Sequence, residues 1–528
     1  MEIKEHDKMF EELVSKIIEM NSSPEDHYEV VALLESFGWN DLRVSSNFGV
    51  EDLFELGINI YDAIKKRGMV GGIVSKKKVS ILQTIILLAK SFLRGVIFAL
   101  PMAISVIAML TLKLSLWSYQ YLSTELATSI AIATILSFIT IGGFTQAIAR
   151  RGYFYISQDY YNMARKITFK FIKMGYLAAA VVIVVLMLLN TFFNLFPFFM
   201  LSAIIIYYLL LCAIWLSVTV MYILQKEILF TALLSVGIAI VYFLFNVIGI
   251  DIIFSQLIAL TIVSILGSIM VYYYFRKAEA KMEKGIAAKL PRMSITIYSV
   301  TPYFLYGISY FSFLYVDRVM AWSTNDIFMP YLIWFRGAYE LGLDFGLLGL
   351  MIPMGVNEVI INNFVLNLEF NENSFKISDT KLFNGYYFKL YFRALITSGI
   401  ISILSAIFVY VFVRILNGEL DHLGVETLIT SDITWFVFQW SLVAYAVIAT
   451  SLLNAVTMFS LSNPFDINKA ILYAFSVNCM VGFLLSRWAD YHYAIFGLVI
   501  GAFVFLYFST KAALKTINEL DYYLYAAS

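Results

Sequence analysis

The chain has 528 residues, of which 61% are hydrophobic and 14% are charged, and its mean hydropathy is +0.80. A soluble globular protein is about 45–50% apolar and about 25% charged, so the composition excludes that class. The formal net charge is zero, which gives no reason to expect nucleic acid among the partners.

Residues 1–75 differ from the rest because they hold 15 acidic and 7 basic residues, a local net charge of −8. The apolar spacing of FEELVSKIIEM and EDLFELGINIYDAIKK predicts a small, soluble module of three helices. We expect one helix to have Ser23 as its N-cap, Pro24 at its first position and Gly38 as its C-cap. The basic residues 76–78 then join the module to the membrane. The charged start of the chain has no apolar segment typical of a cleaved signal peptide.

Twelve apolar segments follow, each long enough to cross a hydrocarbon core of about 30 Å. The first six lie at 92–116, 121–148, 171–195, 198–222, 228–249 and 252–275. The second six lie at 296–318, 327–354, 389–416, 431–456, 468–487 and 492–512. Cys212 and Cys479 fall inside such segments, so we expect small buried hydrophobic side chains and no disulfide.

These segments predict an all-α polytopic membrane protein with about 12 transmembrane helices in two six-helix bundles. The predicted domains are the module at 1–75, the first bundle at 76–275, a cytoplasmic linker at 276–295, the second bundle at 296–515 and a tail at 516–528. No strong residue-level repeat is visible. The relation between the two halves, about an axis along the membrane normal, is therefore inferred from the spacing of the apolar segments.

Basic residues predict the orientation of the chain in the membrane. They concentrate at 76–94, 150–173, 276–292, 376–393 and 511–515, whereas the alternate loops contain few. With twelve spans, all five basic stretches lie on one side, which the positive-inside rule assigns to the cytoplasm. We therefore expect both termini in the cytoplasm and residues 417–431 outside.

The sequence lacks the catalytic and nucleotide-binding motifs that membrane enzymes commonly have. The four histidines, at 6, 27, 422 and 492, lie outside the interiors of the spans, and GGIVSKKK lacks the ending of a phosphate-binding loop. No paired acidic motif for a catalytic metal occurs in the predicted cytoplasmic loops. We predict no catalytic residue, no metal and no cofactor, and hence a protein that is not an enzyme.

Charged residues inside the spans are the main functional signal. Arg336, Glu340 and Asp344 are spaced four apart within the predicted span 327–354, and on a helix they share one face near its middle. Isolated charges there cost at least about 2.5–3.5 kcal/mol each. A purely structural explanation is an Arg336–Glu340 ion pair that joins two helices. One arginine neutralises only one acidic residue, however, so this explanation leaves Asp344 without a counter-charge. We interpret the three residues as a site for coupling to a proton or another cation.

A second pair, Asp317 and Arg318, ends the apolar stretch FLYGISYFSFLYVDRVMAW. If its span begins near 296, position alone favours an interfacial pair that reaches toward water at the outer edge of the membrane.

Two stretches resemble a known family. LYGISYFSFLYVDRVMAWS is similar to the segment that opens the second half of the Pel exopolysaccharide transporter family, whose members have an acidic–basic pair there. GFTQAIARRGYFYISQDYYNMARKI resembles the family's basic, aromatic loop after the second helix. That family belongs to the multidrug/oligosaccharidyl-lipid/polysaccharide (MOP) flippase superfamily, with twelve helices in two bundles. The resemblance covers about residues 80–515 and implies that Asp317 and Arg318 line the substrate pathway. The module is extra, and Arg318 stands where Lys is common.

The sequence thus predicts a flippase of the bacterial cytoplasmic (inner) membrane that exports a polysaccharide or lipid-linked saccharide by alternating access, coupled to an ion gradient. Its expected partners are the saccharide substrate, the lipid bilayer and a cytoplasmic glycosyltransferase docked on the module. Two alternatives remain. One is a small-molecule or drug antiporter of the same superfamily, and the other is a membrane scaffold for a polysaccharide synthase that transports nothing.

Overall fold

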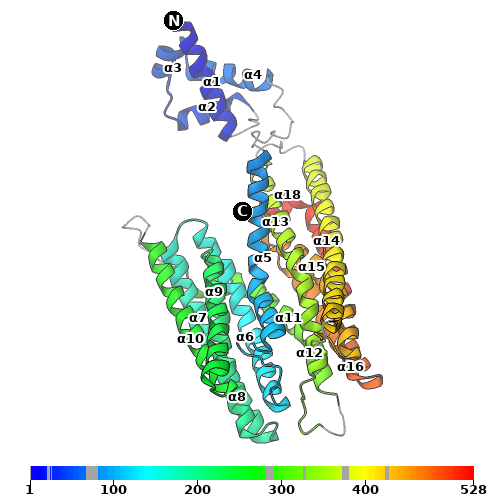
Figure 1. The fold of residues 1–528 in the computed structure, drawn as a ribbon. Helices are drawn as coiled ribbons and strands as arrows, with labels where there is room; N and C mark the ends of the chain where they lie inside the picture. Colours follow the sequence, from blue (N-terminus) through cyan, green and yellow to red (C-terminus); the bar gives the residue numbers. More distant parts are fainter. Residues whose placement is uncertain are drawn as a thin grey trace. The chain divides into compact units, whose positions relative to one another are not determined.

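The structure is a computed structural model that describes residues 2–20, 24, 26–66, 81–280, 290–324, 329–371, 380–422 and 427–527. Every regular element in these ranges is a helix, and none is a strand (Figure 1). The predicted hinge 76–78 and residues 281–289 of the predicted linker lie outside the described residues.

The described part of the chain falls into two compact units. One comprises Met1–Ser91, Val359–Ala394 and Leu514–Ser528, and the other comprises Phe92–Glu358 and Leu395–Ala513. The candidate site treated below lies in the second unit.

The N-terminal module contains four helices within its described residues and not the predicted three. These are α1 (Glu2–Met20), α2 (His27–Ser36), α3 (Asp41–Phe48) and α4 (Leu53–Lys66). The helix missing from the prediction is α3, whose eight residues are too few for a clear apolar period. Apolar residues such as Val14, Leu34 and Ile60 form a core of the module's own.

The predicted N-cap of α2 is wrong. Asp26 caps the helix, because its carboxylate accepts a hydrogen bond from the Glu29 backbone N–H at 2.9 Å. Asp is as good an N-cap as Ser, and Pro24 therefore lies before the helix. Phe37 is the C-cap, and Gly38 follows it with a φ of +80°, in the left-handed region that glycine adopts without strain.

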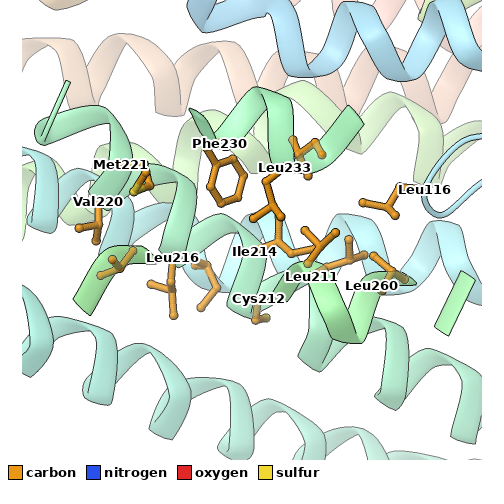
Figure 2. Packing of buried hydrophobic residues seen from close by; sticks show 14 of the residues in the cluster. Leu116, Leu211, Cys212, Ile214, Leu216, Val220, Met221, Phe230, Leu233 and Leu260 are labelled. Atoms are coloured by element: carbon orange, nitrogen blue, oxygen red, sulfur yellow. The ribbon is translucent and has the colours of Figure 1, made fainter. Parts of the chain in front are cut away.

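The first bundle consists of long apolar helices joined by short loops. They are α5 (Ile81–Leu112), α6 (Thr124–Ile156), α7 (Tyr161–Phe193), α8 (Phe198–Ile223), α9 (Glu227–Tyr242) with a π-helical end (Phe243–Ile248), and α10 (Ile252–Glu279). Helix α8 packs against both α6 and α10. Figure 2 shows part of their interior, where Leu211 and the buried Cys212 of α8 lie near Phe230 of α9 and Leu260 of α10.

The second bundle begins with α11 (Met293–Trp322). It continues with α12 (Gly337–Leu347), a 3-10 turn (Leu348–Leu350), α13 (Met351–Asn371), α14 (Thr380–His422), α15 (Asp432–Ser460), α16 (Phe465–Trp488), a 3-10 turn (Tyr491–Ala494), α17 (Ile495–Asn518) and α18 (Leu520–Ala527). Cys479 on α16 is only partly buried, unlike Cys212 and unlike the prediction.

The predicted spans correspond to these helices. Ten helices in the described ranges are long and apolar enough to cross a membrane. Two more, α5 with 32 residues and α11 with 30, have the necessary length and match the predicted spans 92–116 and 296–318. The all-helical, two-bundle architecture is therefore confirmed. The boundary that changes most is that of 327–354, since its helix starts only at Gly337 and runs on to Leu368.

A four-residue repeat relates the first helices of the two bundles. Phe92-Leu93-Arg94-Gly95 in α5 matches Phe304-Leu305-Tyr306-Gly307 in α11. Three of the four residues are identical, and the third is Arg94 in α5 and Tyr306 in α11. The sequence prediction missed this match, because three identical residues in a chain of 528 do not stand out from chance.

Candidate functional site

Asp317 and Arg318 lie in the interior of the protein and not at its surface. Asp317 is 0% exposed and Arg318 is 6% exposed, because α11 is packed between α6 and α16. The expectation of an interfacial pair that reaches toward water is therefore wrong. Arg487 of α16 holds the end of α11 in place by donating to the Met320 and Ser323 carbonyl oxygens at 2.9 and 2.8 Å.

The predicted stripe Arg336–Glu340–Asp344 is only partly helical. Helix α12 begins at Gly337, and Arg336 is its N-cap residue. The backbone before it bonds elsewhere: the Trp334 N–H donates to the Trp322 carbonyl at 2.9 Å, and the Phe335 N–H donates to the Thr128 hydroxyl at 3.1 Å. Glu340 and Asp344 thus occupy the first two turns of their helix, and the predicted position near the middle of a span is wrong.

Arg318, and not Arg336, is the ionic partner of Glu340. The Arg318 Nε and Glu340 Oε2 atoms lie 3.3 Å apart, and both side chains are largely buried. Asp344 lies one turn further along α12, within electrostatic range of Arg318. Arg336 instead lies over the ring of Tyr491, 4.6 Å from its centre. The structure therefore brings Asp317, Arg318, Glu340 and Asp344 together and places Arg336 beside them.

Tyr339 connects the two acidic segments, and no pattern in the sequence indicates its role. Its hydroxyl donates a hydrogen bond of 2.7 Å to Asp317 Oδ2, between two fully buried side chains. Several polar atoms nearby are buried without a hydrogen-bonding partner in the described protein, among them Asp317 Oδ1, Arg318 Nε, Glu340 Oε1 and the Tyr445 hydroxyl. Buried polar atoms are nearly always paired, so such a group marks a place where an ion, water or substrate can bind.

A stack of aromatic rings adjoins the charged residues. The ring of Phe138 on α6 stacks on Trp215, Phe311 and Tyr315, with centre-to-centre distances of 4.3, 5.2 and 5.4 Å. Tyr315 also lies under the Arg318 guanidinium, 4.7 Å away. The aromatic surface therefore extends from the first bundle to the charged site of the second.

The first half lacks this charged site. When α5 and α11 are aligned on Gly95 and Gly307, Asp317 and Arg318 of α11 correspond to Ser105 and Val106 of α5. Counted from the first residue of each helix, Glu340 and Asp344 of α12 correspond to Ala127 and Ala131 of α6. The corresponding helices of the first half therefore do without any charge at these four positions.

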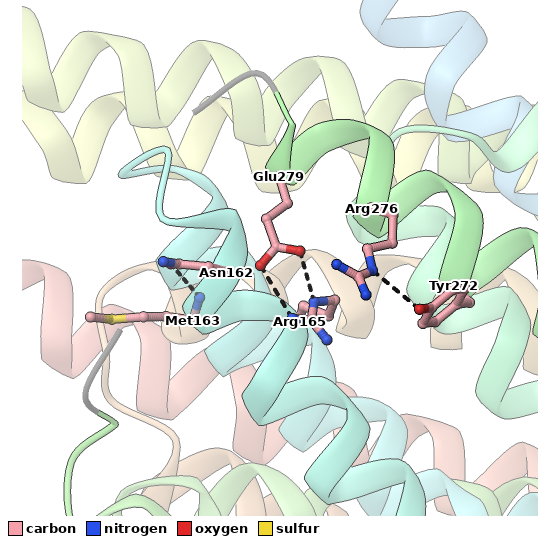
Figure 3. Close-up of polar contacts among 6 residues, drawn as sticks. All are labelled: Asn162, Met163, Arg165, Tyr272, Arg276 and Glu279. Atoms are coloured by element: carbon pink, nitrogen blue, oxygen red, sulfur yellow. Dashed lines mark hydrogen bonds and ion pairs between the residues drawn. The ribbon is translucent and has the colours of Figure 1, made fainter. Parts of the chain in front are cut away.

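Basic residues of the first bundle gather at the end where α6 meets α7 and α10 ends. Figure 3 shows Arg165 of α7 making two hydrogen bonds, of 3.1 and 3.2 Å, to the carboxylate of Glu279 on α10. Arg276 bonds the Tyr272 hydroxyl in the same region. In the described ranges no group of three or more His, Cys, Asp or Glu side chains is placed to hold a metal ion.

Comparison with solved structures identifies the fold. The chain superposes on an outward-facing multidrug resistance MATE family transporter of the MOP superfamily with a TM-score of 0.53 and 13% identity, covering 82% of this chain and 97% of that one. A MATE transporter in complex with MaD3S gives a TM-score of 0.55 at 13% identity, with the same coverage. A mutant of the Vibrio cholerae MATE transporter VcmN gives 0.52 at 15% identity, covering 83% of this chain and 98% of that one.

No family model and no curated protein matches the sequence. The likeness is therefore one of structure: this chain has the two-bundle fold of the MATE transporters of the MOP superfamily.

Proposed function

We propose that this chain exports a polysaccharide or lipid-linked saccharide across the cytoplasmic membrane of a bacterium by alternating access. The main support is the charged site of α11 and α12. Arg318 and Glu340 are largely buried in the protein, and taking charges out of water costs free energy that an ion pair only partly returns. Packing does not require them, because the equivalent positions of the first half are filled by Ser105, Val106, Ala127 and Ala131.

In this proposal Glu340 and Asp344 take up and release a proton or another cation in each cycle. Arg318 balances the charge of Glu340, which is the role that the sequence suggested for Arg336. Asp317, oriented by Tyr339, lines the substrate pathway with Arg318. Two bundles that rock against each other then expose this site to one side of the membrane at a time.

The aromatic stack supports a saccharide as the substrate. Phe138, Phe311 and Tyr315 present ring faces beside the charged site, and the apolar faces of sugar rings can pack on such surfaces while their hydroxyls bond to carboxylates. A drug antiporter is the second candidate, because the same fold occurs in a multidrug resistance transporter.

Neutral substitutions in the site test the proposal. Asp344→Asn and Glu340→Gln keep the size of the side chains but remove the exchangeable charge, so each is expected to abolish export while the protein still accumulates. Glu125→Gln, in the first turn of α6, is the matched control and should export normally. Normal saccharide export by both variants, singly and together, would exclude the coupling role. Loss of drug efflux with unchanged saccharide export would favour the antiporter.

We also propose that the acidic module docks a cytoplasmic glycosyltransferase through a basic, amphipathic helix of that enzyme. Tyr28, Phe54 and Ile58 are 61%, 46% and 44% exposed, and the rings of the first two lie 6.1 Å apart on α2 and α4. With a net charge of −8 over residues 1–75, this apolar patch suits a helix that has one apolar face and basic flanks.

The docking proposal can be tested in the full-length protein. Tyr28→Ser with Phe54→Ser should abolish binding of the purified glycosyltransferase that makes the saccharide, whereas Asn59→Ser should not. Unchanged binding, self-association through the patch, or binding to anionic vesicles alone would overturn it.

A further inference from the structure

We propose that the two bundles rock about an axis that passes through two equivalent helix crossings, one between α5 and α13 and the other between α6 and α11. This inference rests on the proposed transport cycle. It identifies the part of the protein where the rocking of the two bundles displaces the helices least. At both crossings, glycines allow the backbones of the two helices to touch directly.

At the first crossing, Gly95 of α5 lies against the backbone of α13. A Cβ atom on Gly95 would lie 2.6 Å from the Met354 carbonyl oxygen and 2.7 Å from Cα of Gly355. From the other side, a Cβ atom on Gly355 would lie 2.8 Å from both the ring of Phe92 and the Val96 side chain. Because real Cβ contacts are almost never below 3.0 Å, neither position has room for another residue without movement of its neighbours.

At the second crossing, Gly307 of α11 lies against the backbone of α6 at Gly142, so closely that a Cβ atom on Gly307 would overlap the Gly142 carbonyl. The ring of Phe304 covers the neighbouring Gly143, where a Cβ atom would lie 2.6 Å from two of its carbons. The elements are therefore those of the first crossing: a glycine, a phenylalanine three residues before it, and a glycine on the opposite helix.

The two crossings occupy equivalent places in the two halves. Phe92 and Gly95 of α5 hold the same places in the stretch FLRG as Phe304 and Gly307 of α11 hold in FLYG. Gly142 and Gly355 are each the nineteenth residue counted from the start of α6 and of α12. In each case the first helix of one half meets the second helix of the other. Two such points define one line between the bundles, and a rotation about that line leaves both contacts in place.

The contacts away from this line are of a kind that can open and close. Near the C-terminal end of α6, Arg151 bonds the Ser299 hydroxyl at 3.2 Å, and Arg150 bonds the Ser462 hydroxyl at 2.7 Å. At the opposite end, the Phe335 N–H bonds the Thr128 hydroxyl. Arg151 makes a second bond to Ser299, and Arg150 also bonds the Phe459 carbonyl oxygen at 3.3 Å. When the ends separate, water can replace these hydrogen bonds, so the net loss is much smaller than their strength in isolation. Separating two close-packed backbones would instead leave a void in the membrane interior, where packing supplies much of the attraction between helices.

Disulfides at the crossings test this axis, in a protein with Cys212 and Cys479 replaced by Ser. Gly143→Cys with Phe304→Cys places one bridge at the second crossing, because the removed phenyl ring is what a Cβ atom on Gly143 would meet. Phe92→Cys with Gly355→Cys places the equivalent bridge at the first. Arg151→Cys with Ser299→Cys, joined by a short bis-maleimide, is the matched bridge at one end of the bundles.

Spin labels on p-acetylphenylalanine, which does not react through thiols, report the distance between the bundles at each end. One label pair occupies Asp159 and Phe465, and the other occupies Phe198 and Leu332. The reduced protein should show two distances at each end. A disulfide at either crossing should leave both distributions unchanged, whereas the bridge at Arg151 and Ser299 should leave one short distance at its own end and one long distance at the other.

Two outcomes would overturn the proposal: collapse of the distributions when a crossing is bridged, or a single distance at both ends of the reduced protein. If one double variant fails to accumulate, the pair at the equivalent crossing provides the same test. Because the distances are measured without substrate, rocking in a protein that exports no saccharide would refute the proposed transport function and leave the axis standing.

Discussion

Tyr339 and Asp317 are joined by a buried hydrogen bond of 2.7 Å that links α12 to α11 inside the second bundle. The bond fixes one carboxylate oxygen of Asp317 and leaves Oδ1 without a partner in the described protein. In the proposed transport cycle, Tyr339 would therefore decide which oxygen of Asp317 is presented to a bound ion or substrate.

Tyr339→Phe should lower both stability and transport. A hydrogen bond to a charged group contributes about 1.5–3 kcal/mol, and its loss leaves a second Asp317 oxygen unpaired in the interior. Thermal unfolding in detergent measures the loss. Tyr298→Phe on α11 is the control, because Tyr298 is 81% exposed and should have no effect. Equal stability of the two variants would contradict the orienting role of Tyr339.

Arg318→Gln should be among the most destabilising substitutions in the second bundle. Removing one partner of a buried ion pair costs about 3–5 kcal/mol, because the other charge remains buried. The double variant Arg318→Gln, Glu340→Gln should recover part of that stability while remaining inactive. Arg414→Gln, on the exposed face of α14, serves as the control. If the double variant is no more stable than the single one, the two side chains are not coupled.

Gly307→Ala should impair folding or assembly of the bundles, whereas Gly399→Ala should not. The added methyl group at 307 meets the backbone of α6, but nothing lies within 4 Å of the same position on Gly399. Overpacking of this kind costs about 1–3 kcal/mol, and at Gly399 alanine should slightly favour the helix. The amount of folded protein in membranes and its unfolding temperature measure the difference. Similar values for the two variants would show that the α6–α11 contact adapts easily.

The orientation of the chain remains a prediction from its basic residues. A single cysteine at position 284, in place of Lys284, should be inaccessible to an impermeant thiol reagent in intact cells and become labelled when the membrane is opened. A cysteine in place of His422 should be labelled from outside. Labelling of position 284 in intact cells would exclude cytoplasmic termini with twelve spans.

Hydropathy predicted the number and order of the spans, because each apolar segment must be long enough to cross the bilayer whatever its neighbours are. It could not predict where α12 begins. Residues 329–336 are apolar enough to be read as helix, but tertiary hydrogen bonds from Trp334 and Phe335 hold them in another conformation.

The charged residues of the site could be found in the sequence, but not their pairing. Spacing by four suggested a pair between Arg336 and Glu340, since it considers only neighbours on one helix. The actual partner, Arg318, comes from α11, and such contacts depend on how helices pack. Tyr339 and Tyr445 could not be distinguished beforehand from the other 33 tyrosines of the chain.

The glycine crossings also make the protein dependent on the lipid around it. Lipid tails are as apolar as the helix surfaces, so the bundles are held together by close packing, as at Gly95 and Gly307, and by hydrogen bonds between helices. The packing pressure and thickness of the bilayer then act directly on the angle between the bundles. Acyl-chain length should consequently set the ratio of the two states, and a detergent micelle that imposes no thickness should shift it.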